Sequence, residues 1–188
     1  MPTVREPTPV RAEPQDDAEQ VTEALPGEPL IVEESREGWA SVRTAYDYPG
    51  WLHAAALGGE PDPAWLEPRV ADPVAHARSL LGAPYLWGGM TGAGIDCSGL
   101  VHMSFRATGR LVPRDADQQE DAGERVAEAD VRPGDLVTYG GPDAADHVAF
   151  WLGNGRILHS TQRAGVDGVV EEDEPEDLRP RRRVFFRL

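Results

Sequence analysis

The sequence predicts an α+β protein in which a small β-barrel precedes a domain of helices and an antiparallel sheet. Between Gln20 and Leu57, short runs of β-branched and aromatic residues are separated by glycine, proline and charged turns, which is typical of a small barrel. After residue 72, segments with helical periodicity are followed by strand-like runs. A chain of 188 residues can hold one small and one medium-sized domain.

The barrel is expected over residues 16–60. Its predicted strands cover residues 20–22, 29–32, 39–43 and 50–53. Residues 1–15 are proline-rich and polar, so we expect an extended lead-in there. Residues 61–71 begin in a stretch rich in glycine and proline, and we expect them to link the barrel to the second domain, residues 72–188.

Three helices are predicted in the second domain. Asp72 can cap the first helix, with Pro73 at its first position, and Gly82 ends it. The second helix begins at Cys97, behind a loop with several glycines. A short polar helix follows, with Asp115 as its possible cap.

The strands of the second domain are expected over residues 136–139, 147–152 and 156–160. The turn Gly153-Asn154-Gly155 predicts that the last two form a hairpin. Residues 171–177 form an acidic run that we expect to be solvated and functionally silent. Residues 179–188 mix arginines with apolar residues, and we expect an edge strand there.

The charge balance narrows the classes of partner. The 33 acidic and 18 basic residues give a net charge of −15, which argues against nucleic acid or an anionic membrane. One cysteine cannot form an internal disulfide, and no apolar stretch has the length of a signal-peptide core or a membrane span. We expect a soluble cytoplasmic protein. We also expect a monomer that needs no cofactor.

Cys97, the only cysteine, is a candidate nucleophile. A lone cysteine is more often a small buried hydrophobe. Here the upstream glycines leave room for another molecule's backbone, and two histidines follow in strand-like segments. A thiol on the first turn of a helix faces unpaired N–H groups and the positive end of the helix dipole, and both favour the nucleophilic thiolate.

His147 and His159 are the candidate partners of Cys97. They lie on the two strands of the predicted hairpin, far from its turn, so we expect them to meet at one edge of the sheet. A cysteine nucleophile needs a histidine base, and the base needs a polar group to orient it. Structural zinc, the competing use of these residues, favours close ligand pairs and four protein ligands. We therefore predict catalysis and no metal site.

Five motifs occur in a fixed order: Pro84-Tyr85-Leu86-Trp87-Gly88-Gly89, Asp96-Cys97-Ser98-Gly99-Leu100, Pro133-Gly134-Asp135-Leu136, His147-Val148-Ala149 and His159. Over residues 72–188 this order resembles the NlpC family of papain-like bacterial cell-wall cysteine peptidases. The resemblance implies a papain-like α+β catalytic domain. It also implies hydrolysis of the bond between γ-D-glutamate and the diamino acid, meso-diaminopimelate or lysine, in peptidoglycan stem peptides.

The resemblance implies roles for the matching residues. Cys97 would be the nucleophile, His147 the general base and His159 its orienting partner. Tyr85 would place its hydroxyl near the oxyanion, beside the backbone N–H of Cys97.

Three further residues, Asp96, Ser98 and Trp87, match positions that line the substrate cleft of the family. The alternative role is a helix cap for Asp96 and Ser98, and core packing for Trp87. Ala116 stands where relatives carry a hydroxyl residue, which puts one substrate hydrogen bond in question.

The first domain resembles the bacterial SH3-like domains fused to one branch of this family, in which that domain closes one end of the cleft. Acidic and tyrosine side chains would hold the free amine of an N-terminal L-alanine, because an ammonium group needs carboxylate and phenol acceptors. Asp115 matches the acid that the catalytic domain contributes. The first domain offers four candidates for the other partners: Tyr46, Tyr48, Glu19 and Glu28.

The sequence thus predicts an SH3-like β-barrel followed by a papain-like α+β peptidase. The expected reaction releases L-Ala-γ-D-Glu from muropeptides with a free N-terminal alanine, in cell-wall turnover or recycling. Two alternatives keep the fold: a non-catalytic module that binds wall peptides, and a thiol acyltransferase. The acyltransferases usually carry a membrane anchor or an apolar surface, and the sequence given predicts neither.

Overall fold

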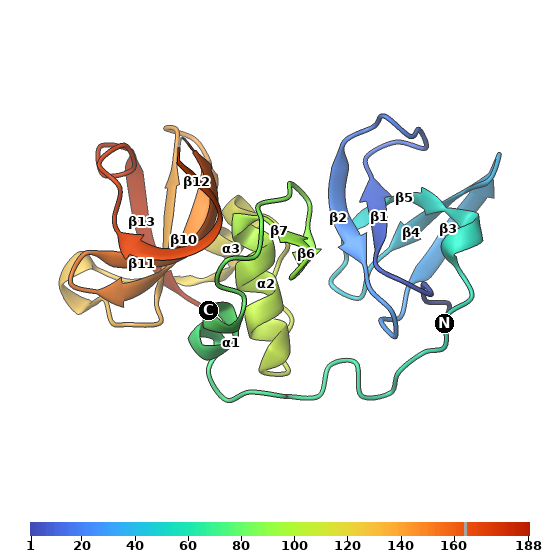
Figure 1. The fold of residues 1–188 in the computed structure, drawn as a ribbon, viewed down its shortest axis with the longest axis horizontal. Coiled ribbons are helices and arrows are strands. Elements are labelled where there is room, and N and C mark those ends of the chain that lie inside the picture. Colours follow the sequence, from blue (N-terminus) through green and yellow to red (C-terminus); the bar gives the residue numbers. More distant parts are fainter. Residues whose placement is uncertain (164) are drawn as a thin grey trace. The chain divides into compact units, whose positions relative to one another are not determined.

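The computed structural model describes residues 1–163 and 165–188, which form two compact units (Figure 1). The first unit contains Met1–Glu67 together with Trp87–Gly89, and the second contains Pro68–Leu86 and Met90–Leu188. No helix among the described residues is both long and apolar enough to cross a membrane.

The first unit is a five-stranded antiparallel sheet with the order β2-β1-β5-β4-β3. Its strands are β1 (Thr8–Arg11), β2 (Gln20–Ala24), β3 (Ile31–Arg36), β4 (Trp39–Arg43) and β5 (Pro49–His53), followed by the short 3₁₀ helix η1 (Ala54–Ala56). Its core contains the buried side chains of Val10, Leu30, Val42 and Leu52. All four predicted strands are present.

The expected extended lead-in over residues 1–15 contains β1, so that expectation is corrected. β1 pairs with β2 on one side and with β5 on the other. Its side chains alternate, with Thr8 and Val10 buried and Pro9 exposed. The prolines of the segment hide this alternation because they are uncommon inside strands.

The second unit combines three helices with a six-stranded antiparallel sheet. The helices are α1 (Pro73–Ser79), α2 (Cys97–Ala107) and α3 (Ala116–Ala122), with the 3₁₀ helix η2 (Glu128–Asp130). The sheet has the order β12-β11-β10-β9-β13-β8, and its strands are β8 (Glu124–Arg125), β9 (Leu136–Gly140), β10 (Ala145–Gly153), β11 (Arg156–Arg163), β12 (Val166–Asp173) and β13 (Arg182–Arg187). A small ribbon, β6 (Met90–Thr91) with β7 (Gly94–Ile95), precedes α2. The predicted α+β class is confirmed.

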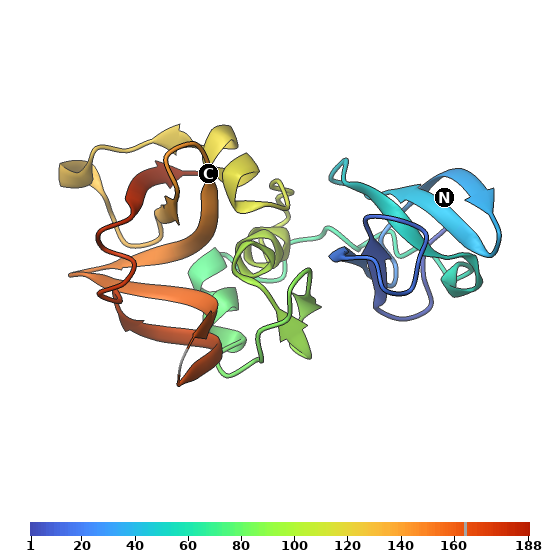
Figure 2. The ribbon, with the colours of Figure 1, turned by 90° about the horizontal axis from the view of Figure 1, so that it is seen from above.

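α2 lies against β10 and β11, and Figure 2 shows it end-on beside the sheet. The core on this side holds Leu100, Phe105 and Phe150. The rings of Phe105 and Phe150 stack with centroids 6.2 Å apart. A second cluster, which includes Tyr139 and Phe185, is also buried. The nonpolar packing against β10 fixes the first turn of α2 relative to the strands.

The predicted hairpin of β10 and β11 is present. Gly153, Asn154 and Gly155 have φ values of 87°, 54° and 74°, a left-handed conformation that glycine and asparagine adopt most readily. Two expectations at the C-terminal end are corrected. β13 lies between β9 and β8 instead of forming an edge. The first part of the acidic run belongs to β12, so it is ordered within the sheet.

Candidate active site

The tip of α2 is set by Asp96, which precedes the helix. Its carboxylate accepts a hydrogen bond from the backbone N–H of Gly99 at 2.6 Å, the usual arrangement of an aspartate cap. Just upstream, the Ser160 hydroxyl of β11 donates to the carbonyl of Ile95 at 2.6 Å. Cys97 is therefore held on the first turn of a helix whose entry is anchored to the sheet.

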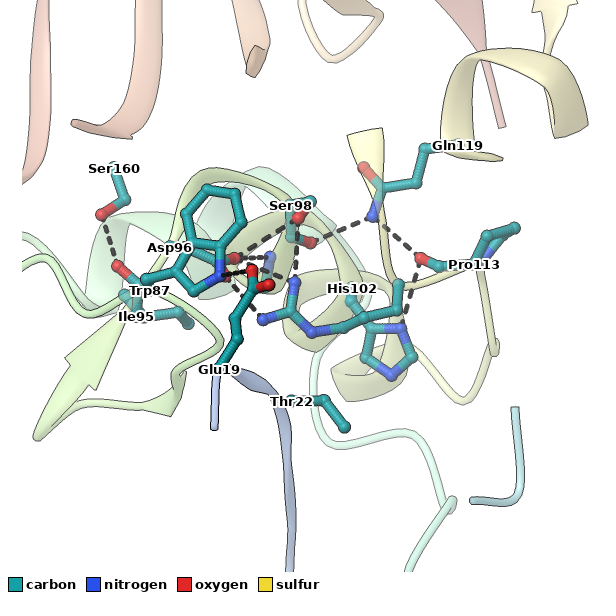
Figure 3. A network of polar contacts seen from close by, with 12 residues as sticks. Glu19, Thr22, Trp87, Ile95, Asp96, Ser98, His102, Pro113, Gln119 and Ser160 are labelled. Atoms are coloured by element: carbon teal, nitrogen blue, oxygen red, sulfur yellow. Dashed lines mark hydrogen bonds and ion pairs between the residues drawn. The ribbon is translucent and has the colours of Figure 1, made fainter. Parts of the chain in front are cut away.

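A buried ion pair fixes this tip from the other side. The Arg114 guanidinium, only 1% exposed, donates to both Asp96 oxygens at 2.9 and 2.7 Å and to the Ser98 hydroxyl at 2.9 Å. Gln119 of α3 donates to the backbone carbonyls of Ser98 and Pro113 (Figure 3). The helix-cap role is thus present for Asp96, and the Ser98 hydroxyl belongs to the same network.

The two candidate imidazoles meet as expected. Nε2 of His147 on β10 lies 2.7 Å from Nδ1 of His159 on β11. Nε2 of His159 lies 2.9 Å from a carboxylate oxygen of Glu172 on β12. The second oxygen of Glu172 contacts Arg163. His147, His159 and Glu172, called here the imidazole chain, therefore run across three neighbouring strands.

Glu172 belongs to the acidic run that we expected to be solvated, and for this residue that expectation is wrong, because its carboxylate contacts His159. β11 and β12 pair with His159 opposite Val170. Side chains two residues apart on a strand share a face, so Glu172 is the diagonal neighbour of His159. Recognising residues 166–173 as a strand would have been the signal, but the acidic composition concealed it.

Cys97 lies beside the strand that carries His147. Its sulfur accepts hydrogen bonds from the backbone N–H groups of Val148 and Ser98. Val148 follows His147 directly on β10. Cys97 thus contacts the residue that follows His147, the first member of the imidazole chain, on β10.

The ionisation of the Cys97 thiol differs from the expectation. Burial, with the charge of Asp96, raises the pKa of the Cys97 thiol to about 12, although the Val148 N–H, Arg114 and the Ser98 N–H oppose the rise. Burial and the charges of His159 and Arg181 lower the pKa of His147 to about 3. Both shifts favour a neutral thiol and a neutral imidazole in the resting site. The expected thiolate is corrected because burial of the sulfur outweighs the helix dipole.

Tyr85 is half-buried near the tip of α2. Burial raises the pKa of its hydroxyl, and the nearby charge of Asp96 raises it further, while Arg114 lowers it. The hydroxyl therefore stays protonated and can donate a hydrogen bond throughout the ordinary pH range.

The segment before Tyr85 is tied to β12. The N–H of Gly82 donates to the carbonyl of Val169, and the N–H of Val169 donates to the carbonyl of Ala83, both at 2.9 Å. Gly168 lets these backbones approach, because a Cβ there would lie 2.2 Å from the Ala83 oxygen. Its φ of 131° also favours glycine.

Asp115 is the N-cap residue of α3, as predicted, but its side chain makes no capping hydrogen bond. Gln118 donates to one of its carboxylate oxygens at 3.2 Å. Ala116 is buried in the main core of the unit.

The remaining candidates belong to the first unit. Trp87 is 57% exposed, which contradicts the core-packing alternative. Its Nε1 donates to Glu19 at 2.8 Å (Figure 3). The hydroxyls of Tyr46 and Thr22 lie 2.9 Å apart, and the Tyr48 ring is 6.3 Å from that of Tyr46. Glu28 is fully buried.

We expect the second unit to lose stability as the pH falls below about 6.5. Burial lowers the pKa of His102 and of His147 from 6.5 to about 3, so the unfolded chain binds protons that the folded chain does not. The free energy of unfolding is largest above pH 6.5 and falls by up to about 1.4 kcal/mol per pH unit for each histidine. Thermal melts from about pH 7.5 to 4 measure the effect. His102→Gln should reduce the slope, and a constant melting midpoint would contradict the expectation.

Comparison with known proteins identifies relatives of both units. Residues 82–176 match the NlpC/P60 family, and residues 10–57 match the bacterial dipeptidyl-peptidase SH3 domain. A γ-D-glutamyl-L-lysine dipeptidyl-peptidase of Bacillus subtilis is 46% identical over 92 residues, which cover 47% of this chain and 31% of that protein. The peptidoglycan endopeptidase RipB of Mycobacterium tuberculosis is 40% identical over 105 residues, which cover 49% of this chain and 43% of RipB. The chain thus spans less than half the length of these relatives.

Solved structures agree with this assignment. An NlpC/P60 protein from Bacillus cereus shares the fold over 97% of this chain and 61% of its own, with a TM-score of 0.57 and 23% identity. The structure of RipB aligns over 69% of this chain and 73% of its own, with a TM-score of 0.54 and 32% identity. RipD of M. tuberculosis, described as a non-catalytic NlpC/P60 domain protein adapted to peptidoglycan binding, aligns over 62% of this chain and 94% of its own, with a TM-score of 0.52 and 26% identity. The predicted SH3-like and papain-like units are confirmed.

Proposed function

The chain belongs to the NlpC/P60 family, and from this membership we propose that it is a cysteine peptidase acting on peptidoglycan stem peptides. The bond cleaved is the one between γ-D-glutamate and the following diamino acid. The observation that carries the proposal is the placement of Cys97 on a helix tip beside β10, next to the residue that begins the imidazole chain. A thiol, a base and a group that orients the base are the parts that such a peptidase requires.

The first step follows from the neutral resting pair. The thiol proton of Cys97 moves to His147 as the sulfur attacks the carbonyl carbon of γ-D-glutamate, because neither partner is ionised beforehand. The carbonyl oxygen becomes an oxyanion, which the backbone N–H of Cys97 and the hydroxyl of Tyr85 stabilise. Donors of this kind are worth about 3 kcal/mol each in the transition state.

The second half of the reaction returns the site to its resting state. His147 gives its proton to the amine of the diamino acid as the C–N bond breaks, and the γ-D-glutamyl group remains as a thioester on Cys97. His147 then takes a proton from water as the water oxygen attacks the thioester. The C–S bond breaks, the sulfur recovers its proton, and the free γ-carboxyl product leaves.

We further propose that the substrates are short peptides with a free N-terminal L-alanine, so that the product is L-Ala-γ-D-Glu. Asp115, which lies at the start of α3, would accept a hydrogen bond from the ammonium group. The roles of Glu19, Glu28, Tyr46 and Tyr48 stay predictions, as do the cytoplasmic location and the monomeric state.

The test is incubation with L-Ala-γ-D-Glu-L-Lys and with the diaminopimelate tripeptide, followed by mass spectrometry. Release of L-Ala-γ-D-Glu from either peptide is the expected result, and the ratio of the two rates identifies the preferred diamino acid. The B. subtilis relative, named for the lysine peptide, motivates the first substrate. Intact tripeptide after prolonged incubation would contradict the proposal.

Asp115→Asn should weaken hydrolysis of the free tripeptide by raising KM about 5–10-fold, because a charged hydrogen bond worth roughly 1.5–3 kcal/mol becomes a neutral one worth roughly 0.5–1.5 kcal/mol. An N-acetylated tripeptide has no ammonium group, so its slower hydrolysis should be unchanged. Steady-state kinetics on both peptides measure the difference. Asp117→Asn, on the exposed side of the same helix, is the matched control, and equal losses on both peptides would exclude the amine-binding role.

A non-catalytic wall-peptide-binding module is the second candidate, because a structural relative is described in those terms. This chain carries all three members of the proposed catalytic set, Cys97, His147 and His159. Calorimetric binding of the tripeptide without turnover would favour the binding module over the peptidase.

A further inference from the structure

Glu172 forms the outer end of the imidazole chain, and its carboxylate has two partners. One oxygen lies 2.9 Å from Nε2 of His159, and the other contacts Arg163. Burial would raise the pKa of Glu172, but the hydrogen bonds from Arg163 and His159 prevail and hold that pKa below its ordinary value. The group is therefore an ionised carboxylate, which can only accept hydrogen bonds.

This acceptor determines where the protons of both imidazoles lie. A neutral imidazole has one N–H and one bare nitrogen. Because Glu172 only accepts, the proton of His159 is on Nε2, and Nδ1 is bare. Nδ1 of His159 lies 2.7 Å from Nε2 of His147, so that nitrogen of His147 must carry the proton. Nδ1 of His147 is then the bare nitrogen that can take the proton of Cys97.

The neighbouring acidic residue has a different environment. Glu171 lies on the opposite face of β12 and forms ion pairs with Arg78 of α1 and Arg156 of β11. Its carboxylate is partly exposed and lies on the same strand as Glu172. Only Glu172 of this pair contacts the imidazole chain.

We infer that Glu172 is a positioning residue that acts through His159 to keep His147 in the tautomer with a bare Nδ1. This inference rests on the proposed function and extends it to a residue outside the Cys97, His147 and His159 set. Arg163 has a supporting part, because it holds the second oxygen of Glu172. The hydrogen bonds of the imidazole chain all point the same way: each donor faces towards Glu172 on β12, and the bare nitrogen is on His147 of β10.

The variant Glu172→Gln should reverse this direction in part of the molecules. A glutamine has one acceptor oxygen, and the cationic Arg163 attracts it more strongly than a neutral imidazole does. The amide N–H₂ would then face His159, whose Nε2 must become bare. His159 would carry its proton on Nδ1 and His147 on Nδ1 also, so His147 could no longer accept the proton of Cys97.

Other charged groups also face the chain. Arg163 and Asp177 act on His159 besides Glu172, and Arg181 acts on His147. These groups remain in the variant. Loss of the Glu172 charge should destabilise the protonated form of His147 that arises during catalysis, and the acid limb of kcat/KM should move to lower pH.

The first experiment is ¹⁵N NMR of the wild-type protein with labelled histidines, assigned with His147→Asn and His159→Asn. The expected result is a protonated Nε2 and a bare Nδ1 on both imidazoles. A bare Nε2 on His159 in the wild type would overturn the inference. This measurement needs no substrate, so it is independent of the proposed function.

The second experiment compares Glu172→Gln with the matched control Glu171→Gln on the tripeptide. Removing the carboxylate that orients a triad histidine lowers kcat about 10⁴-fold, and outer partners of metal-bound histidines contribute about 10–100-fold. We expect Glu172→Gln to lower kcat about 10–100-fold with little change in KM, a mixture of tautomers and a shifted acid limb. Glu171→Gln should leave kcat, the tautomers and the acid limb unchanged. Equal kinetics and tautomers in the two variants would overturn the inference, whereas expected tautomers without wild-type turnover would refute only the proposed function.

Discussion

Replacing the sulfur should abolish catalysis while the fold persists: Cys97→Ala is expected to lower hydrolysis of the tripeptide by about 10⁴-fold or more. The sulfur forms the thioester, and no other group among the described residues is placed to replace it, since Cys97 is the only cysteine. The loss should appear in kcat, because substrate contacts elsewhere remain. Mass spectrometry of long incubations with high enzyme concentration measures the residual rate.

The control for this variant is Ser104→Ala, another small buried substitution on α2. It removes only a contact at 3.3 Å with His76 and should leave kcat within about twofold, since it touches nothing in the proposed mechanism. Both variants should melt within a few degrees of the wild type. Retained turnover by Cys97→Ala would end the cysteine-peptidase proposal.

Breaking the buried ion pair should have the largest effect on stability. Arg114→Met is expected to lower the free energy of unfolding by about 3–5 kcal/mol, because it leaves the Asp96 carboxylate charged and buried without its partner. The Ser98 hydroxyl loses the same donor. Denaturant titrations followed by fluorescence measure the change. The tip of α2 depends on this carboxylate, so we also expect a lower kcat.

Two further variants distinguish the effect of losing the ion pair from the effect of losing a long side chain. Arg110→Met, an exposed arginine above the Phe105 ring, should cost less than about 1 kcal/mol. Adding Asp96→Asn to Arg114→Met should recover part of the loss, because asparagine is neutral and still caps the helix. Equal destabilisation by Arg114→Met and Arg110→Met would show that the buried pair contributes little.

The fold was predictable wherever local signals agreed. Alternation and turn residues located β2, β4 and β5, and the Gly153-Asn154-Gly155 turn located the hairpin. β1 was missed because its segment is proline-rich. The central position of β13 was missed because its partners, β8 and β9, are distant in sequence, and pairing order is a property of the whole sheet.

The proposed site was predictable only in part. The spacing of His147 and His159 about the hairpin turn was enough to predict that they meet. Glu172 looked like one of several surface acids, and Arg114 looked like a surface cation, because burial and partners depend on tertiary packing. The thiolate was predicted from the helix tip alone. The burial that raises the Cys97 pKa comes from the packing of α2 on the sheet.

Gly168 limits how the second unit can be re-engineered. It seats the chain just before Tyr85 directly on the strand that carries Glu172, at a distance that excludes any side chain. The segment before Tyr85, the proposed oxyanion donor, is therefore hydrogen-bonded to the same strand, β12, that carries Glu172, the acceptor of the imidazole chain. Grafting a different β12 into this scaffold would displace both at once, so specificity is better redesigned at residues outside that strand.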